Sequence, residues 1–344
     1  MSLESLPNVV SIGGGTGLAC LLKGLKHAVR EVGETSINRP WISRLTAVVT
    51  VTDDGGSSGR LRNELQVLPP GDIRNCLVAL SADESLLSRL FQYRFAGSGE
   101  LQGHSFGNLF LTALSGVTGD FLESIRVSSD VLATRGRIYP ATLDDVQLEA
   151  VLQDGTHVIV ESAISKSVKR IAKLTLLPRD CRPVPAVLHA IRQADIITLG
   201  PGSLFTSLLP NLLVRGICRE IRKSRALKLY IGNLMSQPGE TTGFTASDHV
   251  FTIYGHARGK LFDGILLNNT AFTRKVLARY KLQGATPVVS DYRRLRAMGL
   301  DIYEATLLAE KDVVRHDPQL LANAVFDAYC AWKASDRNSI LASV

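Results

Sequence analysis

The chain has 344 residues, of which 45% are hydrophobic and 21% charged, and its formal net charge is +7. This composition is typical of a globular protein with a large core, and the length fits one large domain with a subdomain, or two domains. The positive charge favours anionic partners such as nucleotides and phosphorylated metabolites. Because the basic residues are scattered and no nucleic-acid-binding motif is present, we do not expect nucleic-acid binding.

Cysteine usage and hydropathy predict a cytoplasmic protein. The five cysteines lie far apart without a Cys-x-x-Cys pair, so neither a disulfide framework nor a zinc site is expected. No run approaches the roughly 18 apolar residues of a membrane span. The N-terminus also lacks the layout of a signal peptide.

The first predicted strand, residues 8–12, leads directly into a glycine-rich loop and a predicted helix whose leucines begin at Leu18. A strand, a glycine turn and a helix in this order direct the free N–H groups of the helix at an anion. The register matches neither a dinucleotide-binding G-x-G-x-x-G nor a P-loop. We expect a phosphate site here, with a tight turn alone as the alternative. The candidate residues are Gly13, Gly14, Gly15, Thr16 and Gly17.

The second predicted strand, residues 46–52, ends in two adjacent carboxylates, Asp53 and Asp54. Carboxylates of this kind hold Mg²⁺, and in an enzyme these two are candidate catalytic residues. The polar groups that follow can bind phosphate. The alternative is an ordinary strand-to-helix turn with an acidic helix cap. The phosphate-binding candidates of this segment are Gly56, Ser57, Ser58 and Arg62.

Two further polar segments open predicted helices. In the first, Asp72 occupies a position suited to an N-cap or to a ligand, and Arg74 and Asn75 in the first turn can face the same anion. In the second, His104 and Asn108 lie among glycines at a helix start. His104 is a candidate acid or base if the protein is an enzyme, and a structural role is the alternative. Asn108 is a candidate for nucleotide binding.

Residues 145–177 change to a period of two, with predicted strands at 146–152, 157–161 and 169–176. The Asp154-Gly155 pair is a strong hairpin signal. An antiparallel meander therefore interrupts the alternating strand-and-helix pattern.

The second half of the chain repeats the junction between a strand and a polar loop, after predicted strands at 195–199, 226–231 and 262–268. Ligands of open parallel sheets bind at the carboxyl ends of the strands, where the strand order reverses. A basic helix at 272–281 and a strand at 287–290 follow. The candidate binding residues of these loops are Gly200, Gly202, Ser203, Thr206, Ser207 and Asn233.

Together these patterns predict an α/β fold with a doubly wound, mostly parallel, Rossmann-like sheet and an inserted antiparallel β meander. We expect a single domain over residues 1–335, with the β insertion at about 145–177 and a disordered tail at 336–344.

Six motifs occur in this order: Gly-Gly-Gly-Thr-Gly, Asp-Asp-Gly-Gly-Ser-Ser-Gly-Arg-Leu-Arg, Pro-Pro-Gly-Asp-Ile-Arg-Asn, Gly-His-Ser-Phe-Gly-Asn, Gly-Pro-Gly-Ser-Leu-Phe-Thr-Ser and Gly-Glu-Thr-Thr-Gly-Phe-Thr-Ala-Ser-Asp-His. The set resembles the YvcK-type gluconeogenesis factors of the CofD (2-phospho-L-lactate transferase) superfamily, over roughly residues 7–330. The resemblance implies a nucleotide site at the glycine loops and binding of UDP-sugars such as UDP-N-acetylglucosamine. It also implies a regulatory role in carbon metabolism and in cell-wall or cell-shape control. Two family positions linked to the UDP-sugar match Tyr280 and Arg315.

The enzyme branch of the superfamily transfers a phospholactyl group with Mg²⁺. This chain shares two glycine loops with that branch but differs from it in the Asp-Asp-Gly-Gly-Ser-Ser-Gly segment. The favoured hypothesis is therefore a nucleotide-sugar-binding regulator, and the alternative is a Mg²⁺-dependent transferase of a nucleotide-activated phosphoryl group. A nicotinamide-dependent dehydrogenase is a weaker third hypothesis. No tightly bound organic cofactor is expected, and the chain is a candidate homodimer.

Overall fold

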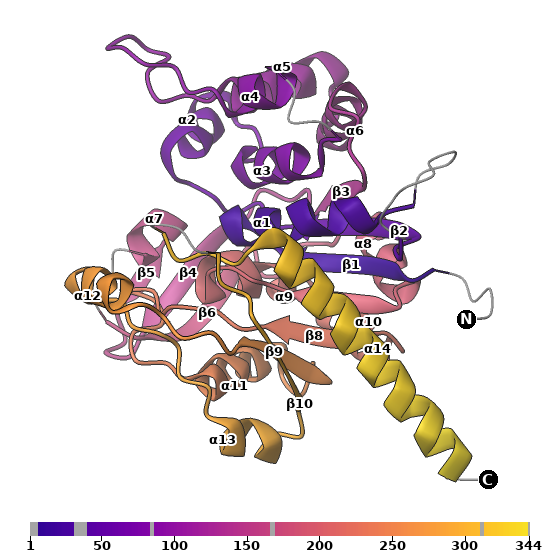
Figure 1. Cartoon of the computed structure of the whole chain (residues 1–344). Helices are drawn as coiled ribbons and strands as arrows, with labels where there is room; N and C mark the ends of the chain where they lie inside the picture. Colours follow the sequence, from indigo (N-terminus) through magenta and orange to yellow (C-terminus); the bar gives the residue numbers. More distant parts are fainter. Residues whose placement is uncertain (1–5, 31–39, 83–85, 166–168, 310–312, 343–344) are drawn as a thin grey trace.

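The computed structural model describes residues 6–30, 40–82, 86–165, 169–309 and 313–342, with side chains to residue 335 (Figure 1). Seven parallel strands form one sheet in the order β10-β9-β8-β7-β1-β2-β3. This confirms the expected doubly wound parallel sheet. The strands are β1 (Asn8–Gly13), β2 (Arg44–Val49), β3 (Arg137–Pro140), β7 (Ile196–Leu199), β8 (Leu227–Ile231), β9 (Gly264–Asn268) and β10 (Asp301–Ala305).

The strand order reverses between β1 and β7. From β1 the sheet grows through β2 to β3, and from β7 it grows through β8 and β9 to β10. The two central strands are apolar runs buried on both faces, as expected of strands covered by helices on each side. The loops that leave their carboxyl ends, residues 14–17 and 200–207, therefore flank the crevice in which such sheets bind ligands.

Each face of the sheet has its own hydrophobic core, as the alternation along β1 shows. Val9 packs with the helices of one face, whereas Val10 and Ile12 pack with those of the other. The first face is covered by α1 (Gly15–Leu25), α3 (Gly71–Leu80) and α14 (Pro318–Ala342). The second is covered by α8 (Pro185–Arg192), α9 (Leu209–Leu213), α10 (Ile217–Lys223) and α11 (Ala246–Ala257).

A layer of further helices packs outside α3 and extends the first core through Phe91, Leu111 and Ile125 (Figure 1). It contains α2 (Gly56–Leu65), α4 (Leu86–Gln92), α5 (Phe106–Thr118) and α6 (Phe121–Val131).

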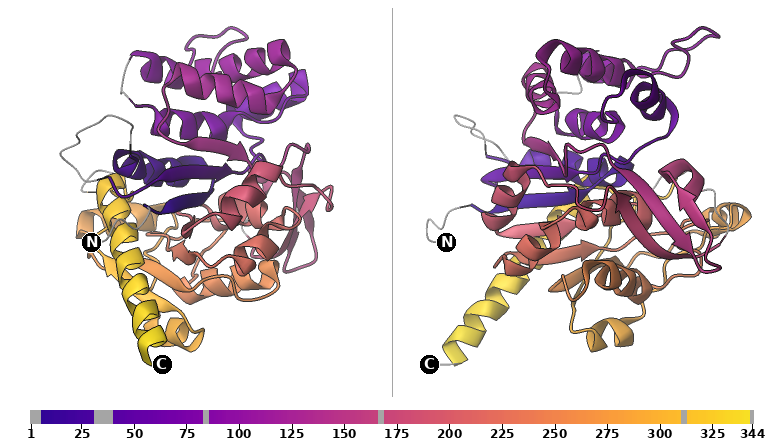
Figure 2. Two further views of the ribbon diagram at one scale, coloured as in Figure 1. Left: turned by 90° about the vertical axis from the view of Figure 1, so that its right-hand side faces the viewer. Right: turned by 180° about the vertical axis from the view of Figure 1, so that it is seen from behind.

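The antiparallel insertion is confirmed. Strands β4 (Gln147–Leu152), β5 (His157–Ile159) and β6 (Ile171–Leu177) form a separate sheet in the order β5-β4-β6. Figure 2 shows this sheet at one side of the main sheet, and Leu148 and Leu174 join the second core. The short helix α7 (Glu161–Ile164) follows β5.

Some expectations were wrong or incomplete. Residues 287–290 form only isolated bridges, to Met235 and Thr245, and not a strand. The edge strands β3 and β10 were not anticipated. The backbone of α14 is helical to Ala342, where the sequence predicts a disordered tail, and residues 343–344 lie outside the described part. Among the described residues, no helix combines the length and apolar character needed to cross a bilayer.

Candidate functional site

The two glycine loops at the reversal of strand order touch each other. A Cβ atom on Gly17, in the first turn of α1, would lie 2.4 Å from the carbonyl oxygen of Pro201. Gly15, at the start of α1, has a φ of +60°, which favours glycine. The close approach places the N-terminus of α1 directly beside the loop after β7.

Two asparagines hold these loops in place. Asn211 Nδ2 donates to the carbonyl oxygens of Gly13 (3.1 Å) and Ser207 (2.8 Å), and so ties β1 to the loop after β7. Asn233 Nδ2 donates to the carbonyl oxygen of Gly202 at 3.0 Å. Asn233, a predicted nucleotide-binding residue, thus supports the loop, and its buried Oδ1 has no partner among the described residues.

The hydroxyls of the second glycine loop face different ways. Thr206 Oγ1 donates to Glu240 Oε1 (3.3 Å), and the Phe205 N–H donates to Glu240 Oε2 (3.3 Å), so Thr206 is engaged inside the fold. Burial raises the pKa of Glu240 above its usual range. Ser207 instead lies toward the first loop, with Oγ 3.5 Å from the position of a Cβ on Gly15.

Two carboxylates meet beside the first loop, but they are Asp53 and Asp72. A Cβ on Gly71 would lie 2.6 Å from Asp53 Oδ2, and a Cβ on Gly14 would lie 2.6 Å from Asp72 Oδ2. Burial and the charge of Asp53 raise the pKa of Asp72 to about 7. The predicted N-cap role of Asp72 is wrong, because Pro70 occupies the N-cap of α3 and Asp72 follows inside the first turn.

Asp54 points away from this pair. Its carboxylate accepts hydrogen bonds from the N–H (2.8 Å) and Oγ (2.9 Å) of Ser162 on α7. Asp54 therefore joins the β2 loop to the antiparallel insertion. Arg62 does the same from α2, since its guanidinium bonds to Asp145 and to the carbonyl oxygen of Val146 (2.7 Å).

Four of the other polar candidates, Ser57, Ser58, His104 and Asn108, form a buried cluster between α2 and α5. Ser57 Oγ lies 3.0 Å from His104 Nδ1 and accepts from Asn108 Nδ2 at 3.1 Å. Asn108 Nδ2 also reaches Ser58 Oγ, at 3.4 Å. His104 is only 3% exposed, and burial together with Arg60 lowers its pKa, so its imidazole is neutral at pH 7. In this geometry His104 positions the start of α2.

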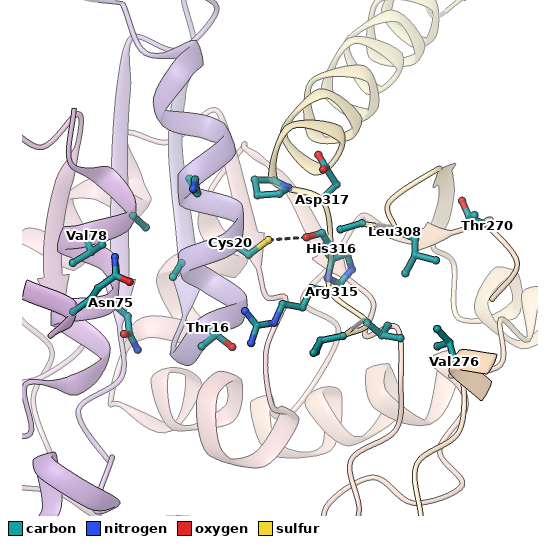
Figure 3. Close-up of a pocket in the computed structure, with 18 of the residues that line it drawn as sticks. Thr16, Cys20, Asn75, Val78, Thr270, Val276, Leu308, Arg315, His316 and Asp317 are labelled. Carbon is teal, nitrogen blue, oxygen red and sulfur yellow. Dashed lines mark hydrogen bonds between the residues drawn. The ribbon is translucent and has the colours of Figure 1, made fainter. Parts of the chain in front are cut away.

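A cleft of about 1840 Å³ opens beside the N-terminal half of α1. Its walls are α1, the α3–α4 side, the segment from β9 into α12 (Arg274–Leu282), and the loop from β10 to α14. Figure 3 shows Arg315 projecting from that last loop toward Thr16, with Asn75 across α1. Among the described lining residues Asp317 is the one carboxylate, against eight cations: Lys23, Lys26, Arg74, Arg89, Arg94, Lys275, Arg279 and Arg315.

Tyr280 and Arg315 lie together, as the resemblance implies. Tyr280 Oη accepts a hydrogen bond of 2.9 Å from the N–H of Val314, the neighbour of Arg315 in the chain. The Arg279 guanidinium lies 5.6 Å from the centre of the Tyr280 ring. Tyr280 thus fixes the loop that carries Arg315 into the cleft.

The family model described as 2-phospho-L-lactate transferase CofD matches residues 9–308 of this chain. The chain belongs to the CofD family. It is 46% identical over 321 residues to the gluconeogenesis factor of Halalkalibacterium halodurans, covering 93% of this chain and 96% of the relative. It is 45% identical over 322 residues to the gluconeogenesis factor of Bacillus subtilis, covering 93% and 98%.

A crystal structure of a protein from Bacillus halodurans has a TM-score of 0.87 and 46% identity, over 93% of this chain and 99% of that one. These comparisons confirm the resemblance that the six motifs indicated.

The CofD family's enzyme branch implies Mg²⁺, and the Asp53–Asp72 pair fits such an ion. Mg²⁺ is commonly bound by one or two carboxylates together with substrate phosphates and water. The pair lies beside the loop after β1, and burial together with the charge of Asp53 raises the pKa of Asp72, although Arg74 acts in the opposite direction. A bound Mg²⁺ would neutralise charge on a diphosphate. Among the described residues, no group of three or more His, Cys, Asp or Glu is arranged as a metal site.

Sequence reasoning missed several residues of this CofD-family site. Asn211 lies inside an apolar helix, and nothing in its spacing signals that it binds two loops. Cys20, whose Sγ donates to the carbonyl oxygen of His316 at 3.1 Å, is on the cleft-facing side of α1. A helical-wheel projection places Thr16, Cys20 and Lys23 on one face of α1, and this pattern could have indicated which side of the helix lines the cleft.

Proposed function

We propose that this CofD-family protein is a cytoplasmic nucleotide-sugar-binding regulator, with a ligand of the UDP-N-acetylglucosamine type and a role in carbon metabolism and cell-wall or cell-shape control. The observation that carries the proposal is the cationic cleft beside the N-terminus of α1. The relatives named gluconeogenesis factors support the metabolic part of the proposal.

The cleft suits an elongated dianionic ligand. The N–H groups of α1 favour a diphosphate at Thr16, and Arg315 approaches from the opposite wall as a bidentate donor. The wall beyond Arg315 contains Phe272, Val276 and Leu308, which offer apolar contact to a base. Diphosphate and base would then lie in sequence along one groove.

A regulator needs binding without turnover, and the placement of two candidate catalytic groups supports this. His104 is buried against Ser57, and Asp54 is engaged by Ser162. Neither of them lines the cleft among the described residues.

Isothermal titration calorimetry with UDP-N-acetylglucosamine tests the proposal. We expect a Kd in the micromolar range, about −8 kcal/mol, and an Arg315→Gln variant that binds at least tenfold more weakly. Arg293→Gln, which changes an exposed arginine outside the cleft, is the matched control. Absence of binding to every uridine or guanosine diphosphate ligand would overturn the proposal.

The second candidate is a Mg²⁺-dependent transferase of a nucleotide-activated phosphoryl group, favoured by the Asp53–Asp72 pair beside the diphosphate loop. Its test is nucleotide release from UDP- and GDP-activated donors with Mg²⁺ and small acceptors. Release that Asp53→Asn abolishes would establish the transferase. Quantitative recovery of the intact ligand would rule out the transferase and favour the regulator.

A further inference from the structure

The α3–α4 side of the cleft contains a second group of cations, separate from Arg315. Arg74 on α3 and Arg94, which follows α4, both line the cleft there. They lie 20 positions apart in the sequence, yet both contact one residue, Ser105. Arg74 Nη1 donates to Ser105 Oγ at 2.7 Å, and the backbone of Arg94 forms an antiparallel bridge with Ser105.

Several contacts hold the Arg74 side chain at this position. Its Nη2 donates to Asn75 Oδ1 at 2.7 Å, and its side chain is 8% exposed. A Cβ on Gly107 would lie 2.9 Å from Arg74 Cγ and 2.6 Å from the carbonyl oxygen of Phe91, so only glycine leaves room for the guanidinium stem. Gly107 therefore provides the space that the Arg74 side chain occupies.

This arrangement leaves positive charge without full compensation. Arg74 Nε is buried and has no hydrogen-bond partner among the described residues. The charge of Arg94 acts on Arg74, and so do the opposite charges of Asp72 and Asp53. Within the described part of the chain, the partner of Arg94 Nη1 is a backbone oxygen, that of Gly103, at 3.0 Å. Two arginines that repel each other at a cleft wall are stabilised by an anion between them.

We propose that Arg74 and Arg94 form a second anion subsite, which binds a carboxylate or phosphate group beyond the diphosphate of the ligand. The inference rests on the proposed function and narrows its ligand class. The preferred ligand is a nucleotide sugar that carries an acidic group on its sugar, or a neutral nucleotide sugar that binds together with a small free anion. Arg315 and the α1 N-terminus serve the diphosphate, and the α3–α4 side serves the second anion.

Calorimetry on the full chain with two matched ligand pairs tests the subsite. UDP-glucose is compared with UDP-glucuronate, and UDP-N-acetylglucosamine with its lactyl ether, UDP-N-acetylmuramate. We expect the acidic member of at least one pair to bind about tenfold more tightly, the effect of one added charge-assisted contact. If no acidic member gains affinity and phosphate has no effect, the inference falls while the proposed function stands. If no member of either pair binds, the proposed function itself fails.

Variants of Arg94 test whether the preference for the acidic ligand arises at this residue. Arg94→Gln should remove the preference for the acidic ligand, measured as the ratio of the two affinities within a pair, and Arg94→Lys should restore part of that ratio. Arg293→Gln on α13 (Tyr292–Ala297) serves as the charge-matched control. If Arg94→Gln weakened the binding of both members of a pair equally, the subsite would be contradicted, because the loss would then reflect the overall positive charge of the cleft and not a local contact.

Inorganic phosphate distinguishes the two sources of the anion. If the anion is part of the ligand, millimolar phosphate should weaken binding of the acidic ligand and not of its neutral partner. If it is a free anion, phosphate should strengthen binding of the neutral ligand, and Arg94→Gln should abolish that gain.

Discussion

Tyr280 Oη accepts the backbone N–H of Val314 at 2.9 Å, across 34 residues of sequence. The contact joins α12 to the loop that leads into α14, and it fixes the backbone immediately before Arg315. Under the proposed function, Tyr280 would act on the ligand through the position of Arg315.

This relationship predicts the effect of Tyr280→Phe. The change removes one hydrogen bond, of about 1 kcal/mol, and releases the loop. UDP-sugar affinity measured by calorimetry should fall about tenfold, with little change in Tm. Tyr93→Phe, at a ring that is 51% exposed, provides the control. Wild-type affinity in Tyr280→Phe would show that the loop is held by other contacts.

The contact between the glycine loops predicts a large effect of Gly17→Ala. A methyl group there would lie 2.4 Å from a backbone oxygen, which cannot move away as a flexible side chain can. We expect the free energy of unfolding to fall by about 2 kcal/mol and ligand binding to be lost.

Gly116→Ala on α5 is the matched control for that variant, because its added Cβ meets no atom within 4 Å. It should raise the unfolding free energy by about 0.5–1 kcal/mol through helix propensity. Urea denaturation measures both variants, and equal stability of the two would contradict the proposed clash.

The raised pKa of Asp72 predicts a pH dependence of stability. Because the carboxyl has a pKa of about 7 when folded, against 3.8 as its ordinary value, the folded state binds more protons between these pH values. The free energy of unfolding should therefore decrease as the pH rises through this window, by up to about 1.4 kcal/mol per pH unit for one group. Asp72→Asn should flatten this slope, and the difference between the two proteins in urea denaturation at pH 5 to 8 isolates the group. Identical slopes would show that Asp72 is ionised throughout.

Mg²⁺ should separate the roles of the adjacent carboxylates. Asp53→Asn removes a member of the pair with Asp72, so any effect of Mg²⁺ on ligand affinity should disappear. Asp54→Asn breaks the bonds to Ser162 instead, and it should lower Tm while retaining the Mg²⁺ effect. Titrations with and without Mg²⁺, combined with thermal unfolding, compare the two. Loss of the Mg²⁺ effect in Asp54→Asn alone would reverse this assignment.

Much of the fold could be predicted from local pattern. The apolar runs of β1, β2, β7 and β8 are buried strands whose surroundings match their sequence, and glycine directly follows β1, β7 and β8. The edge strands could not be found in this way. β10 is short, polar and partly exposed, and β3 ends in Pro140, so their pairing is set by neighbouring strands rather than by their own composition.

The close approach of the glycine loops at the ends of the central strands could be predicted from the sequence, but the direction of each polar side chain could not. Whether a polar residue in such a loop faces a ligand or the interior depends on partners far away in sequence. Thr206 meets Glu240, Asp54 meets Ser162 and Arg62 meets Asp145, and each partner lies in a segment whose position only the folded chain defines.

Gly24 of α1 lies against the first turn of α14. A Cβ at Gly24 would lie 1.9 Å from the carbonyl oxygen of Pro318, so the two helices cross with backbone against backbone. Helix α14 has 25 residues, from Pro318 to Ala342, and is therefore about 37 Å long at the helical rise. Its far half projects beyond the sheet (Figures 1 and 2). Pro318 follows Arg315 by three positions. The backbone contact that seats α14 on α1 therefore also fixes the end of the loop that contains Arg315.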